Sequence, residues 1–93
     1  DNMVQTIIED KQGFLWIGTG GGGLNQFNKE TEKFFAFKNI PNDTSSLAHN
    51  SVKCLYEDKN GAIWVGTHGG LDKFDKEKGI FFNFDQHNGL PNN

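Results

Sequence analysis

The chain repeats itself once, and this repetition restricts its fold more than any other feature of the sequence. Residues 2–19 match residues 50–67, and residues 23–37 match residues 70–84 with one residue less between them, because the first repeat carries an extra glycine. Residues 47–50 also match residues 90–93. The segment that precedes this match is shorter in the second repeat than in the first. Self-similarity at a fixed period is typical of architectures in which each unit packs against its neighbours.

Each repeat is predicted to form four short strands. Nine phenylalanines, two tryptophans and twelve glycines among 93 residues favour short aromatic strands joined by glycine turns. No stretch shows sustained helical periodicity. The expected strands cover residues 4–10, 15–19, 24–28 and 34–38, and then residues 52–58, 63–67, 71–75 and 80–85.

Four antiparallel strands in each unit of about 45 residues describe a blade of a β-propeller. We therefore predict an all-β chain of two four-stranded antiparallel β-propeller blades, residues 1–49 and residues 50–93. A single eight-stranded sandwich or barrel has the same number of strands. The regular recurrence of glycine, aromatic and turn positions favours blades.

The repeated string E-D-x-x-G-x-[LI]-W-[IV]-G-T, followed by Gly-Gly-Leu and an aromatic residue, resembles the two-component-regulator propeller repeat. The resemblance covers essentially the whole chain, including the spacer at residues 41–47. It implies a many-bladed periplasmic sensor domain upstream of a membrane helix, a histidine kinase and a response regulator. It also implies an oligosaccharide as a candidate ligand.

The motif residues are interpreted as structural. Each aspartate precedes a turn glycine, so we expect it to accept hydrogen bonds from turn amides. We expect both tryptophans to be largely buried between blades, the alternative being stacking on a sugar. Each phenylalanine pair, at residues 34–35 and 81–82, is expected to pack on both sheet faces. The motif residues are Glu9, Asp10, Gly13, Trp16, Gly18, Thr19, Glu57, Asp58, Gly61, Trp64, Gly66 and Thr67.

No catalytic or cofactor-binding pattern emerges, so we predict a chain that is not an enzyme and has no cofactor. Adjacent carboxylates in a strand point to opposite faces and cannot act on one bond. The glycines at residues 20–23 lack the Lys-Ser/Thr of a phosphate loop. His49, His68 and His87 lack the spacing of a metal site. Cys54 lies in an apolar alternation and is expected to be buried.

Charge and hydropathy narrow the choice of partners. The net charge is −3 and every basic residue is a lysine, which argues against nucleic-acid binding. No apolar run reaches the roughly 20 residues of a membrane helix, so we expect a soluble fragment without membrane contact.

Three functions remain open. The chain is part of a sensor that binds a carbohydrate or similar ligand, or a structural module that assembles with copies of itself, or a fragment of a propeller-type lyase or hydrolase. We favour the first two, which are compatible. Two blades leave two apolar faces uncovered, and the last residues match the first, so head-to-tail association would continue the repeat. A ring of three or four copies is expected. The sequence does not identify the ligand or the blade number of the parent protein.

Overall fold

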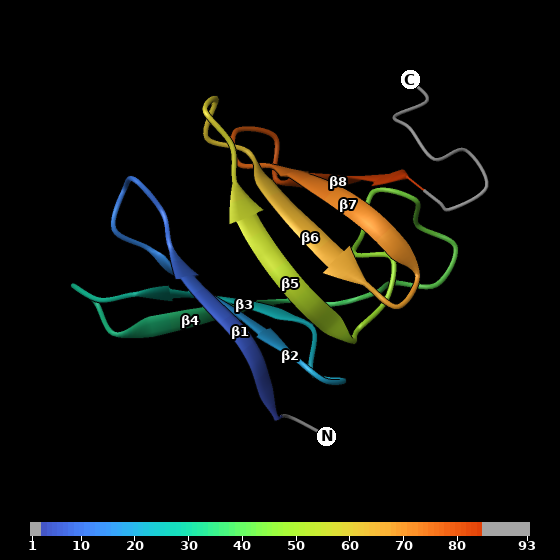
Figure 1. Cartoon of the computed structure of the whole chain (residues 1–93), viewed down its shortest axis with the longest axis horizontal. Helices are drawn as coiled ribbons and strands as arrows, with labels where there is room; N and C mark the ends of the chain where they lie inside the picture. Colours follow the sequence, from blue (N-terminus) through green and yellow to red (C-terminus); the bar gives the residue numbers. More distant parts are fainter. Residues whose placement is uncertain (1–2, 85–93) are drawn as a thin grey trace.

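The computed structural model describes residues 3–84, which form eight strands (Figure 1). None of residues 3–84 lies in a helix. The strands end within one residue of the expected positions, and the final expected residue, at 85, lies outside the described part. The strands are β1 (Val4–Glu9), β2 (Leu15–Thr19), β3 (Leu24–Asn28), β4 (Lys33–Phe37), β5 (Val52–Glu57), β6 (Ile63–Thr67), β7 (Gly70–Asp75) and β8 (Ile80–Phe84).

The strands form two antiparallel sheets, in the orders β1-β2-β3-β4 and β5-β6-β7-β8. This meander is the predicted blade topology, and the alternative of a single eight-stranded sandwich or barrel is wrong. The repeats also share their irregularities, because each first strand has a register shift next to its valine, Val4 in β1 and Val52 in β5. Equivalent residues of the two blades therefore point to equivalent faces.

The core lies between the two sheets. Strand β5 packs across β1 and β2, and Figure 1 shows the two sheets stacked with β5 nearest the first sheet. Each fully buried aliphatic or aromatic side chain stabilises such a core by about 1.5–3 kcal/mol. The buried apolar residues are Trp16, Leu24, Leu47, Val52, Ile63, Val65, Phe74 and Phe81.

Strand alternation explains which side chains enter this core. In the first blade, Trp16, Leu24 and Phe37 point toward the second blade, because their positions in β2, β3 and β4 share one face of the sheet. In the second blade the opposite face is buried, and it supplies Ile63 and Phe74. The two blades therefore pack head to tail, with non-equivalent faces in contact, rather than through the same face of each blade.

The segment between β4 and β5 packs along the second blade. Leu47 is buried in the core, and the Ala48 amide donates to the Asp72 carboxylate at 2.8 Å. The Phe81 amide donates to the Ser45 carbonyl at 2.9 Å. Asp72 is buried among these groups. The linker is therefore an integral part of the interface, and the proposed division at residue 49 remains a prediction.

The burial predicted for the paired phenylalanines is largely wrong, and the burial predicted for Cys54 is wrong as well. Of the paired phenylalanines only Phe81 is buried, whereas Phe34, Phe35 and Phe82 are exposed. Among residues 3–84 no blade covers the outer face of the first sheet, which carries Phe34, and Phe35 lies on β4, the edge strand of that sheet. Phe82 lies on the face of the second sheet that points away from the first blade. Cys54 is exposed as well, since its strand position faces away from the first blade.

Candidate functional site

The aspartate of each motif organises the turn between the first two strands of its blade. The Asp10 carboxylate accepts hydrogen bonds from the amides of Gln12 and Phe14 through one oxygen and from the Trp16 indole N–H, at 2.8 Å, through the other. The second blade repeats this network around Asp58. Its partners are the amides of Asn60 and Ala62 and the indole of Trp64.

Glycines permit the sharp turn and the close approach of the blades. Gly13 and Gly61 have φ of 92° and 86°, in the left-handed region that side chains disfavour. Gly18 serves a different purpose, because a Cβ atom there would lie 2.5 Å from Cγ1 of Val52 in the other blade. Its absent side chain leaves room for β5.

The strand-ending threonines bind the next turn. Thr19 Oγ1 donates to the Gly23 carbonyl at 3.0 Å and accepts from the Gly22 amide at 2.9 Å. Thr67 makes the same pair of bonds in the second blade. These threonines therefore hold the turn between the second and third strands.

The two tryptophans occupy equivalent positions but different environments. Trp16 is fully buried and lies 5.5 Å, centroid to centroid, from Phe74 of the second blade. Trp64 is only half-buried, with Phe84 beside it and the Lys73 ammonium 5.5 Å from its ring centre. The expectation of similar burial is wrong for Trp64, because within residues 3–84 no further blade covers that face of the second sheet.

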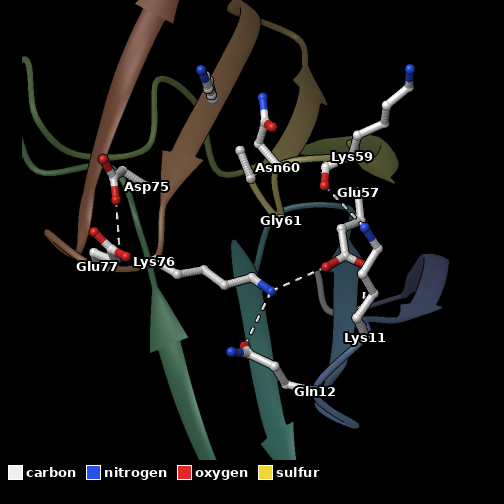
Figure 2. A pocket seen from close by; sticks show the side chains of 11 residues that line it. Lys11, Gln12, Glu57, Lys59, Asn60, Gly61, Asp75, Lys76 and Glu77 are labelled. Carbon is white, nitrogen blue, oxygen red and sulfur yellow. Dashed lines mark hydrogen bonds and ion pairs between the residues drawn. The ribbon is translucent and has the colours of Figure 1, made fainter.

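A polar cluster joins the turns of the two blades. The Lys76 ammonium lies 3.0 Å from the Asp10 carboxylate, 3.3 Å from the Gln12 side-chain oxygen and 3.3 Å from the Glu57 carboxylate. Figure 2 shows Lys76 extending toward Gln12 and Glu57 from the far side of the groove. The Lys11 amide donates to Glu57 as well, at 3.0 Å. We call Asp10, Lys11, Gln12, Glu57 and Lys76 the turn cluster.

Burial and hydrogen bonding set the pKa values of the aspartates. Burial opposes ionisation of Asp10, but hydrogen bonds from Trp16 and Lys76 outweigh it and hold its pKa below the ordinary value. The Trp64 hydrogen bond does the same to the pKa of Asp58. Burial raises the pKa of Asp72, and the hydrogen bonds from Ala48 and Asn83 only partly oppose it.

The turn cluster borders a groove of about 450 Å³ between the blades. Its lining includes four lysines and three acidic residues. These groups can hydrogen-bond a polar ligand, but Glu57 is already paired with Lys76 and Lys11. Such a pairing suits a structural contact better than proton transfer to a substrate. The lining residues are Lys11, Gln12, Glu57, Lys59, Asn60, Gly61, Ala62, Lys73, Asp75, Lys76 and Glu77.

The adjacent carboxylates of each motif do not converge. Glu9 pairs with Lys29 at 2.8 Å, whereas Asp10 faces its own turn and Trp16. The rings of His49 and His68 lie 5.6 Å apart, a proximity that the sequence did not indicate, and His87 lies outside the described residues. Within residues 3–84 no group of three or more potential metal ligands comes together.

Lysine 76 is the interface residue that sequence reasoning missed. The signal was present, because Lys29 and Lys76 occupy equivalent positions after the third strand of each repeat. Strand alternation alone does not indicate that this side chain reaches the neighbouring blade.

The fold and the blade interface define the class of protein: the chain consists of consecutive β-propeller blades. Residues 1–21 and 46–69 match the family model of the two component regulator propeller. Each matched segment includes the first two strands of one sheet, so both copies of the repeat are similar to the two-component-regulator propeller repeat. Comparison with curated proteins gave no match.

Solved structures with the same fold include extracellular domains of two component and one component systems from B. thetaiotaomicron. One is described as the extracellular domain of a hybrid two component system, BT3049, with a TM-score of 0.75 and 23% identity over 94% of this chain and 19% of that one. Another is the extracellular domain of BT4673, described as a one component and also as a hybrid two component system. Its TM-score is 0.73, with 28% identity over 89% of this chain and 11% of that one. The chain therefore spans about a fifth or less of these structures.

Among the described residues, no helix has the length and apolar character needed to cross a membrane.

Proposed function

We propose that this chain is a two-blade part of an extracytoplasmic sensor propeller in a two-component signalling protein. The observation that supports this most strongly is that both blades carry the family repeat and superpose on extracellular sensor domains. In this role the chain contributes blades to a ligand-binding ring. The proposed ligand class is an oligosaccharide.

The proposal includes assembly of the chain with copies of itself. Its apolar faces require cover, and three or four copies would give the six or eight blades of a closed propeller. Native mass spectrometry at micromolar concentration tests this directly. A trimer or tetramer is expected, and a folded monomer at every concentration would contradict it.

Ligand binding is tested on a glycan array with the isolated chain and, in parallel, with a complete sensor domain that contains it. Binding by the complete domain alone would assign the site to the assembled ring. Binding by neither would contradict the carbohydrate proposal. The same preparations distinguish the enzymatic alternative, a lyase or hydrolase. Polysaccharide turnover that Glu9→Gln with Glu57→Gln abolishes would support that alternative.

A further inference from the structure

The outer face of the first blade carries the repeat equivalents of residues that the second blade buries. Val4 is 53% exposed and Phe34 is 64% exposed, whereas their equivalents Val52 and Phe81 are 0% and 4% exposed. Phe27 is half-buried, and its equivalent Phe74 lies in the core. The same residue types are therefore present without the partner that covers them in the second blade.

The outer face of the second blade has the complementary property. Leu71 is 42% exposed, while its equivalent in the first blade, Leu24, is fully buried. Trp64 and Phe84 lie 5.7 Å apart on this face, as Trp16 and Phe37 lie 6.0 Å apart inside the interface. This face thus reproduces the surface on which the second blade is seated.

The polar groups of the internal interface are duplicated on the two outer faces as well. Lys29, the equivalent of Lys76, is paired with Glu9 of its own blade, as Lys76 is paired with Glu57. Lys76 additionally reaches Asp10 of the preceding blade at 3.0 Å. The equivalent acceptor for Lys29 is Asp58, which lies at the far end of the chain's own second blade. A second copy of the chain would bring these opposite charges together.

A slot on the first blade marks where the neighbouring linker would lie. It has a volume of about 440 Å³, and Asn25, Phe34 and Ala36 are among its lining residues. The equivalent residues of the second blade include Asp72 and Phe81, and there the linker residues 45–48 lie against them. Leu90 is the sequence equivalent of the buried Leu47 and lies outside the described residues.

We propose that the two outer faces are the halves of one interface and that each binds a second copy of this chain head to tail, with Lys29 of one copy paired to Asp58 of the preceding copy. The inference rests on the proposed assembly and specifies its surface and direction. It follows from continuity with the internal interface and from matched charges, because the lysine–aspartate pair and the apolar contacts that it requires already exist once within the chain.

Two variants test this directly, since each blocks one face. Phe34→Glu places a charge on the first blade's outer face, and Leu71→Glu does so on the second. Both side chains are exposed in the single chain, so far-UV circular dichroism should match the wild type. Each variant alone should be monomeric by native mass spectrometry. An equimolar mixture should give a heterodimer of twice the chain mass, because each variant retains one functional face.

Matched controls separate the outcomes. Ile40→Glu alters an exposed linker residue outside both faces and should assemble like the wild type. Lys29→Met should raise the concentration at which half of the chains assemble by about tenfold, and Lys33→Met should not. If the wild type assembles but the two face variants also assemble, or their mixture stays monomeric, this inference is overturned while the proposed assembly stands. A wild type that never assembles would overturn both.

Discussion

Replacing each tryptophan by alanine tests whether the two repeats differ only in the presence of a neighbour. Trp16 is fully buried, contacts Phe74 of the other blade and donates to Asp10. Truncation of a buried tryptophan costs about 3–5 kcal/mol, and the lost hydrogen bond to a carboxylate places Trp16→Ala toward the upper end. Trp64 is half-buried, so Trp64→Ala should cost about 1–2 kcal/mol in the single chain, because less area returns to water.

The assay is urea denaturation followed by far-UV circular dichroism, at a concentration where native mass spectrometry shows monomers. A chain of 93 residues has a free energy of unfolding of roughly 5–14 kcal/mol. Trp16→Ala would therefore leave only a small free energy of unfolding. Trp16→Phe is a milder variant, because it keeps an aromatic ring at this position. Equal losses for Trp16→Ala and Trp64→Ala in the monomer would refute the difference in environment.

Repeating the measurement at a concentration where the chain assembles adds a second test. There the cost of Trp64→Ala should rise toward that of Trp16→Ala, because a neighbouring copy would cover Trp64, whereas the cost of Trp16→Ala should change little. A cost of Trp64→Ala that does not depend on assembly would show that Trp64 lies outside the contact between copies.

Three other predictions concern single positions. Gly18→Ala should destabilise the chain by about 1–3 kcal/mol in urea titration, since the added carbon meets Val52, whereas Gly20→Ala meets only a flexible glutamine side chain and should be close to neutral. Folding lowers the pKa of Asp10. The wild type should therefore have a larger free energy of unfolding than Asp10→Asn, and this difference should be fully present above the unfolded pKa of about 4. The difference should decline as the pH falls through the lower pKa of the folded state. A difference that grows on acidification would contradict this assignment. Cys54 is exposed, so a maleimide should label it rapidly in the folded monomer and more slowly after assembly, as followed by mass spectrometry.

The repeat predicted the blade topology well because its signals are local. Turn glycines, strand alternation and the aspartate before each turn depend on neighbours in the sequence, and the structure places Asp10 and Asp58 in the expected turns. The sequence did not predict burial equally well. Trp16 and Trp64 have the same local sequence, but one is covered by a blade and the other is not. Burial depends on which blade packs against a face of the sheet. The motif is local to each repeat and does not indicate whether a neighbouring blade is present.

The differences between the repeats concern the linker more than the strands. The second blade places the buried Asp72 against the Ala48 amide and the Asn83 side chain, and the first blade has Asn25 at the equivalent position. The residue equivalent to Ala48 is Pro91, which has no amide hydrogen to donate. A carboxylate buried against proline would lose one of the two donors that partly offset its desolvation, whereas the neutral asparagine carries no charge to stabilise. The two positions differ together in the direction that the proposed head-to-tail assembly requires: Asp72 accepts from the amide that Ala48 offers, and in the assembly the neutral Asn25 would be matched with Pro91, which offers no amide hydrogen.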